Sequence, residues 1–208
     1  MRFKVFFGTL LALALATNIA GCAIFEGGNV PKTTLADYVD DGTSKLSISY
    51  KCLAKGGLFS TSESSDTGQS VIEGELLTVL VSSNYFGSIS QDDPSADISM
   101  DVTLTNTANP LAMIPAVITG LSLYLIPSWA TDNFEVVAKV KRQDGFAKEY
   151  TLTDSTILVQ WLPMVFALPA NNFSQIPEVR KNMYRKMLSD MQKDGFFSNY
   201  ESTASLAD

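Results

Sequence analysis

The first 22 residues constrain this chain more than any other stretch. A short basic start, with Arg2 and Lys4, precedes an apolar run from Val5 to Ala16. Small residues, Ala20 and Gly21, then close the segment. This is the layout of a secretory signal, and the apolar run is too short for a comfortable permanent membrane span. The remainder of the chain is therefore expected to fold after export.

The signal ends in Ile19-Ala20-Gly21-Cys22. This ending resembles the lipobox of bacterial lipoproteins, which is a branched apolar residue, a small residue, Gly and Cys. The resemblance implies a diacylglyceryl group on the Cys22 thiol, cleavage between Gly21 and Cys22, and often acylation of the new amino group. Each buried methylene contributes about 0.8 kcal/mol, so two or three acyl chains anchor a protein stably. The alternative is an ordinary signal peptide with a chance cysteine.

Ala23 follows the cysteine. In Gram-negative lipoproteins an Asp at that place favours retention in the inner membrane. The resemblance therefore implies a lipid anchor in the outer membrane, a domain that faces the periplasm, and the membrane itself as a partner through acylated Cys22.

Composition narrows the function further. Removing 21 of the 208 residues leaves 187, which is enough for one domain with a real core. Without Arg2 and Lys4, 13 Lys and Arg stand against 22 Asp and Glu, a net charge of −9. No basic stripe is visible, which argues against a nucleic-acid partner. Histidine is absent, which excludes Ser-His and Cys-His nucleophile pairs and His-ligated zinc.

No residue pattern predicts a catalytic, cofactor or metal site, and we expect a protein that is not an enzyme. Asp97 and Asp101 invite a metal or acid–base interpretation. Their spacing of four in an alternating strand pattern places both on the solvent face, where acidic residues are common. Lys139, Lys141 and Arg142 cluster near a turn. They indicate a solvated strand edge rather than a phosphate site, because no glycine-rich loop accompanies them.

Acylation of Cys22 would leave Cys52 as the single free thiol. Cys52 lies in an apolar strand pattern. We therefore expect a small buried hydrophobe rather than a disulfide partner or a reactive nucleophile.

Hydrophobic periodicity predicts the elements of the mature part. Alternation predicts strands over 45–53 and 97–105, a short strand over 86–89 and a hairpin over 133–152 with a turn at Gly145. A helical period predicts helices over 71–81 and 173–194. This order indicates an α+β fold in a single domain, a mostly antiparallel sheet with helices on one face.

The same patterns divide the chain into four parts. They are a signal peptide over 1–21, a tether over 22–44, a periplasmic α+β domain over 45–197 and a flexible tail over 198–208. An ordered arm packed on the domain is the alternative to the tether.

Two uncharged segments, 111–126 and 157–168, are the most apolar parts of the mature chain. Prolines interrupt both, so a short helix over 111–119 and a strand over 121–126 are expected rather than a membrane span. The competing interpretation is contact with a membrane or a protein partner. Trp129 and Trp161 fit either a core or a membrane interface. Exposure of 111–126 would favour self-association or membrane contact, and an internal apolar cavity would favour ligand binding.

The strand–helix–strand pattern over about 45–105, closed by Asn84-Tyr85-Phe86, resembles small periplasmic lipoprotein domains. Such domains serve as auxiliary or assembly subunits of envelope machines, among them ABC-transport-associated lipoproteins and ring components of curli or polysaccharide secretion. The resemblance implies a scaffold or auxiliary subunit of a cell-envelope complex. The alternative is a lipoprotein that binds a lipid or another small ligand.

Overall fold

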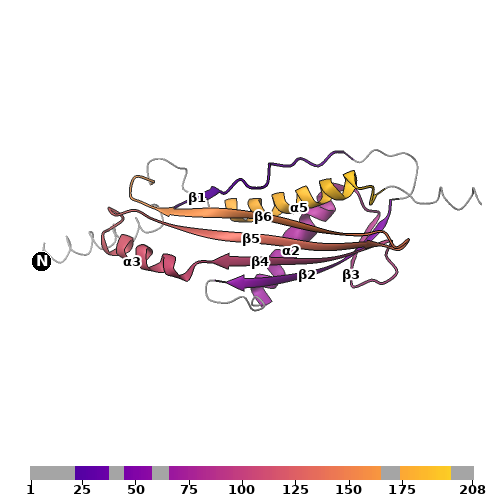
Figure 1. Ribbon diagram of the computed structural model, residues 1–208, viewed down its shortest axis with the longest axis horizontal. Helices are drawn as coiled ribbons and strands as arrows, with labels where there is room; N and C mark the ends of the chain where they lie inside the picture. The colour runs from indigo at the N-terminus through magenta and orange to yellow at the C-terminus, as the bar shows by residue number, and fades with distance from the viewer. Residues whose placement is uncertain (1–21, 38–44, 58–65, 165–173, 198–208) are drawn as a thin grey trace, which may run out of the picture. The chain divides into compact units, whose positions relative to one another are not determined.

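The structure, a computed structural model, describes residues 22–37, 45–57, 66–164 and 174–197 (Figure 1). In chain order its elements are β1 (Cys22–Glu26), β2 (Ser47–Gly57), α2 (Asp66–Ser83), β3 (Ser88–Gln91), β4 (Ile98–Ala108), the 3₁₀ turn η1 (Pro110–Ala112), α3 (Met113–Leu121), β5 (Ser128–Arg142), β6 (Ala147–Gln160) and α5 (Gln175–Lys193). The six strands form one sheet in the order β1-β6-β5-β4-β2-β3. The sheet is mixed, because β2 runs parallel to β3 and β4 whereas β1 is antiparallel to β6. The predicted α+β class is confirmed.

Within this domain the chain forms two compact units. The described residues of unit 1 are 22–27, 108–133, 155–164 and 174–179, and those of unit 2 are 28–37, 45–57, 66–107, 134–154 and 180–197. Strands β5 and β6 contribute residues to both units.

The core of unit 2 lies between the sheet and the helices α2 and α5, which pass behind the strands in Figure 1. Strand alternation and helical periodicity both place apolar residues in this layer, as predicted. Its buried side chains include Ile98, Met100, Val102 and Leu104 from β4, Phe134 and Val136 from β5, Leu76 and Leu80 from α2, and Met183, Met187 and Leu188 from α5. Asn84 and Gly195 follow α2 and α5 with φ angles of 57° and 80°, the left-handed geometry of a helix stop.

Residues 22–37, which lie in the predicted tether, include the strand β1. Ala23 and Ile24 are buried as part of β1. Further along, the Asp154 carboxylate accepts hydrogen bonds from the N–H groups of Asn29 and Val30, at 3.1 and 3.2 Å. Burial of apolar side chains and capture of backbone donors together hold this stretch in place. The rest of the predicted tether, 38–44, and the predicted tail, 198–208, lie outside the described residues.

The predicted strand over 121–126 is wrong. The chain leaves α3 through a Schellman motif, in which the Tyr124 N–H donates to the Thr119 carbonyl at 2.8 Å and the Leu123 N–H donates to Gly120 at 3.1 Å. Leu123 and Tyr124 adopt φ angles of 54° and 64°, which no strand allows. The alternation of leucines that suggests a strand comes instead from a tight helix end.

Candidate functional site

Unit 1 carries a broad exposed apolar surface, built by η1, α3 and the chain that follows. We name it the 111–129 surface. Its members, each more than a third exposed, are Leu111, Met113, Ile114, Val117, Ile118, Leu121, Leu123, Leu125, Ile126 and Trp129. Leu121 is 82% exposed and Trp129 is 67% exposed. Contiguous apolar patches of this kind on soluble proteins mark sites of contact with proteins, ligands or membranes.

Helix α3 is arranged with its apolar side chains outward. Its only buried residue is Thr119, which is fully buried and donates its hydroxyl to the Pro115 carbonyl at 3.0 Å. Ser122 behaves similarly, because its hydroxyl donates to the Thr119 carbonyl at 2.9 Å and accepts from the Ile126 N–H at 3.1 Å. These polar side chains are therefore satisfied within the chain, and the apolar side chains are those that meet the surroundings.

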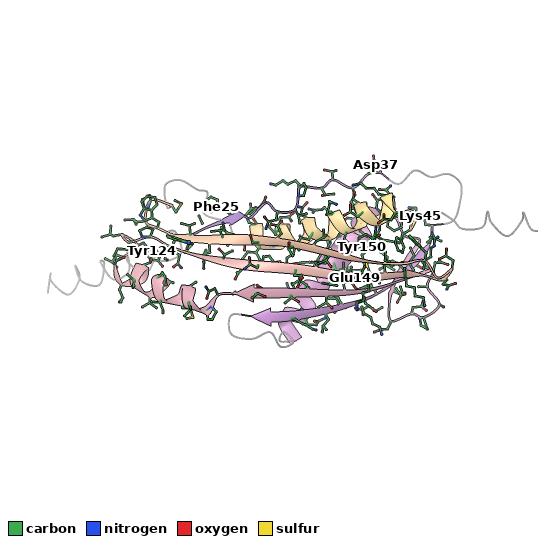
Figure 2. All side chains as sticks on the ribbon, in the orientation of Figure 1. Phe25, Asp37, Lys45, Tyr124, Glu149 and Tyr150 are labelled. Carbon is green, nitrogen blue, oxygen red and sulfur yellow. The ribbon has the colours of Figure 1, made fainter. Side chains whose placement is uncertain are left out.

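The backbone N–H groups that follow α3 also have hydrogen-bond acceptors within the chain. The N–H groups of Ser122, Leu123, Tyr124, Leu125 and Ile126 all donate to acceptors within 118–122, at 2.8 to 3.1 Å. The next residue, Pro127, has no N–H. The Tyr124 carbonyl accepts from the Leu162 N–H at 2.9 Å, which fixes this turn to the chain beyond β6. Figure 2 shows Tyr124 beside α3.

The predicted lipidation site, Cys22, lies next to this surface within unit 1. Cys22 pairs with Gln160 across β1 and β6, and the Gln160 amide nitrogen lies 3.8 Å from the Cys22 sulfur. The side-chain amide oxygen of Gln160, Oε1, accepts a hydrogen bond from the Ser128 hydroxyl at 3.2 Å. Trp161 and Trp129 directly follow Gln160 and Ser128 in the sequence. Gln160 lines a hollow of about 40 Å³ together with Ala112, Ala116 and Trp129. Helix α3 and Gln160, the residue that contacts Cys22, therefore border the same hollow.

Charge is distributed unevenly between the two units. Among the described residues of unit 1 the charged ones are Glu26, Asp132 and Glu178, and the 13 Lys and Arg that follow residue 22 all belong to unit 2. The second predicted apolar segment, 157–168, begins in β6 in this unit. Trp161 there is 38% exposed, and residues 165–168 lie outside the described part of the chain.

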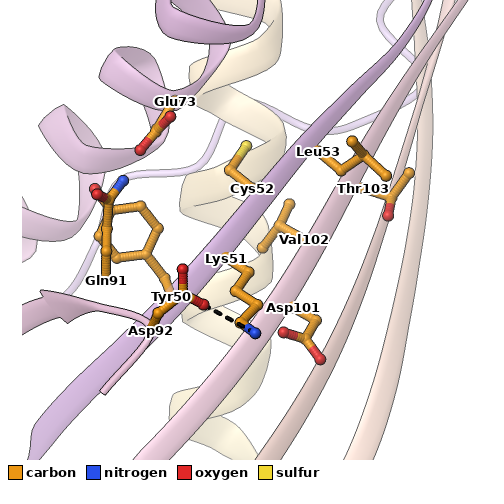
Figure 3. A pocket seen from close by; sticks show the side chains of 10 residues that line it. All are labelled: Tyr50, Lys51, Cys52, Leu53, Glu73, Gln91, Asp92, Asp101, Val102 and Thr103. Atoms are coloured by element: carbon orange, nitrogen blue, oxygen red, sulfur yellow. Dashed lines mark ion pairs between the residues drawn. The ribbon is translucent and has the colours of Figure 1, made fainter. Parts of the chain in front are cut away.

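Unit 2 holds an open cleft of about 630 Å³ along β2 (Figure 3). Lys51 and Asp92 form an ion pair across it at 2.9 Å, with both side chains two-thirds exposed. Exposed pairs of this kind contribute little energy. Cys52 lines the same cleft, and burial raises the pKa of its thiol to about 12. The predicted inert character of Cys52 is consistent with this pKa.

The other charged residues that the sequence singles out are not brought together. Asp97 accepts hydrogen bonds from the Ser47 N–H and hydroxyl at 2.8 and 2.6 Å, which tie the starts of β2 and β4 together. Asp101 is exposed at the cleft. In the predicted basic cluster, Arg142 binds Asp144 at 2.6 Å and Lys139 lies 3.9 Å from Glu149.

A second cavity in unit 2, of about 340 Å³, is lined by glycines, by apolar side chains and by Lys55, Asn106 and Arg180. Arg180 is engaged by Glu75, through two hydrogen bonds of 2.7 and 2.6 Å, and lies over the Phe134 ring. The Asn106 side-chain oxygen is buried and has no hydrogen-bond partner among the described residues.

Comparisons with known proteins identify no family. No protein-family model matches the chain, and no curated protein sequence matches it significantly. Among solved structures, a dodecamer of a PelC point variant from Paraburkholderia phytofirmans aligns with a TM-score of 0.33 and 8% identity, over 82% of this chain and 97% of that chain. A minor lipoprotein from Acinetobacter baumannii aligns with a TM-score of 0.26 and 9% identity, over 72% of this chain and 91% of that chain. Likenesses this distant carry no argument about function.

Proposed function

We propose that this protein is a non-enzymatic lipoprotein, anchored in the outer membrane by acylated Cys22, that faces the periplasm and serves as a scaffold or auxiliary subunit of an envelope complex. The observation that carries the proposal is the 111–129 surface, because apolar side chains kept outside a folded unit indicate contact with a membrane or a partner protein rather than a reaction. Ala23 supports the outer-membrane address through the resemblance to lipoproteins.

The anchor is tested by metabolic labelling with a radioactive fatty acid. The wild-type chain and Cys52→Ala should both incorporate label, because Cys52 is not part of the lipobox. Cys22→Ala should incorporate none. Label that persists in Cys22→Ala, or that disappears from Cys52→Ala, would contradict the proposed anchor.

The scaffold role is tested by native mass spectrometry of the acylated protein extracted in mild detergent. A closed homo-oligomer or a stoichiometric protein partner is expected. A lipidated monomer without a partner would argue against this role and leave the ligand-binding alternative.

That second candidate function, binding of a small ligand, is favoured by the 340 Å³ cavity and by the Asn106 oxygen, which has no partner in the described part of the chain. A buried acceptor without a donor costs about 1–3 kcal/mol, and a ligand with a hydroxyl or N–H group would supply the donor. Native mass spectrometry should then detect an added mass that Asn106→Leu loses. Two results together would count against this function. They are a wild-type protein that carries no added mass and an Asn106→Leu variant that folds with unchanged stability.

A further inference from the structure

We infer that the 111–129 surface lies in the interfacial region of the same bilayer that holds the acyl chains, as a second membrane contact of this protein. The inference rests on the proposed anchor and names the occupant of the surface. Four independent features of unit 1 lead to it.

The first feature is continuity with the anchor. The Cys22 sulfur contacts Gln160, and Gln160 lines one hollow together with Ala112 of η1 and Ala116 of α3. A diacylglyceryl group on that sulfur therefore leaves the protein next to the apolar side chains. With the acyl chains in the bilayer, the surface beside them meets lipid before it meets any partner.

The second feature is the internal pairing of the backbone N–H groups of the turn over 122–126. In hydrocarbon each unpaired backbone N–H is costly, whereas in water it is not. The turn over 122–126 pairs every N–H internally, and the Thr119 and Ser122 hydroxyls bond to carbonyls of their own helix and turn. A protein–protein interface uses polar groups at its rim, about one hydrogen bond per 100–200 Å². This surface keeps those groups turned inward, which fits lipid better than a second copy of the chain.

The third feature is the position of the tryptophans. The chain has two, Trp129 and Trp161, and both belong to unit 1 and are exposed. Tryptophan is enriched at the level of lipid headgroups, where its ring is partly apolar and its N–H meets water. With no Lys or Arg in the mature part of unit 1, contact here is apolar rather than electrostatic.

The fourth feature is the exposed leucine at the end of α3. Leu123 occupies the left-handed position of the Schellman motif, where glycine is usual, and its side chain remains exposed. A large apolar side chain at a strained, solvent-facing position leaves most of its surface in water, and contact with lipid would cover it. The nine residues of α3 span only about 14 Å, less than half of a hydrocarbon core of about 30 Å, so the helix lies in the interface rather than across it. Among the described residues, no helix is both long and apolar enough to cross a membrane.

The test is quenching of tryptophan fluorescence by lipids that carry bromine on their acyl chains. Acylated Trp161→Phe, in which Trp129 is the single tryptophan, is purified from membranes and reconstituted into phosphatidylcholine vesicles with and without brominated lipid. The matched control is the triple variant Trp129→Phe, Trp161→Phe, Lys139→Trp, which places the single tryptophan at an exposed position of unit 2.

Trp129 should lose most of its emission in brominated vesicles and resist acrylamide in the water phase. The control should show the reverse. Emission of Trp129 that acrylamide quenches and brominated lipid does not would overturn the inference. Protection of Trp129 from both quenchers would overturn it too, because a protein surface would then be its cover. The mass of the same preparation separates the two proposals, since absent acyl chains refute the anchor and present acyl chains with an unquenched Trp129 refute only the membrane contact.

Discussion

Two tyrosines of unit 2 differ in the hydrogen bonding of their hydroxyl groups, and we expect the two hydroxyls to have opposite effects on the free energy of unfolding. The Tyr150 hydroxyl donates to Asp194 at 2.7 Å, whereas the Tyr184 hydroxyl is buried without a partner among the described residues. Burial raises the pKa of both phenols. Both phenols therefore stay protonated. They differ in that the Tyr150 hydroxyl has a hydrogen-bond partner and the Tyr184 hydroxyl has none among the described residues.

Tyr184→Phe should leave the free energy of unfolding unchanged or raise it by about 1 kcal/mol, because the variant removes an unsatisfied buried group. Tyr150→Phe, the matched control, should lower it by about 1 kcal/mol. Chemical denaturation monitored by circular dichroism measures both values. A larger loss for Tyr184→Phe than for Tyr150→Phe would show that the Tyr184 hydroxyl has a partner.

Cys52 should be unreactive in the folded protein. With a pKa of about 12, roughly one thiol in 10,000 is ionised at pH 8, and the thiolate is the form that reacts. Iodoacetamide should therefore label Cys52 slowly in buffer and rapidly in denaturant, as mass spectrometry would show. Equal labelling rates in the two solvents would refute the inert character of this partly buried thiol.

Asp97 makes stability depend on pH. Hydrogen bonds from the Ser47 hydroxyl and N–H hold the pKa of this carboxyl below its usual value near 3.8. A carboxyl whose pKa is lower in the folded state adds stability above its unfolded pKa, and this stability is lost as pH falls through the folded pKa. Melting temperatures should therefore fall more steeply below about pH 4 in the wild type than in Asp97→Asn. Asp101→Asn removes the same charge from an exposed site of β4 and is the control; parallel curves for wild type and Asp97→Asn would contradict the account.

At the scale of elements, alternation and helical periodicity were enough to predict β2, β4, the β5–β6 hairpin, α2 and α5. These elements each have one buried face, so their sequence repeats with their geometry. The end of α3 could not be predicted in this way. Leu121, Leu123 and Leu125 alternate as in a strand, but Leu123 occupies a position where a glycine would have signalled a helix end.

Substitution of that leucine should separate folding from contact. Leu123→Gly relieves a left-handed residue and should leave the free energy of unfolding unchanged or raise it by up to about 1 kcal/mol. Leu121→Gly, two residues earlier and inside α3, should lower it by about 1 kcal/mol. Both variants remove an exposed leucine and should weaken membrane contact alike. Equal stability losses would mean that Leu123 is not strained.

At the scale of the whole molecule, the sequence predicted where apolar residues gather but not which way they face. An uncharged run such as 111–126 has the same composition whether it fills a core or lies outside, and its periodicity is too irregular to decide. The resemblance to a lipobox predicted Cys22 as the anchor, whereas the pairing of β1 with β6, which places Cys22 opposite Gln160, joins residues 138 positions apart. Only the fold places the predicted anchor and the 111–129 surface in one unit.

The anchor at Cys22 is the claim on which the rest depends, and the intact mass of the protein purified from its own membranes tests it most directly. The account predicts a chain that begins at Cys22 and carries the added mass of two or three acyl chains. A chain that retains Met1, or that begins at Cys22 without added mass, would contradict it.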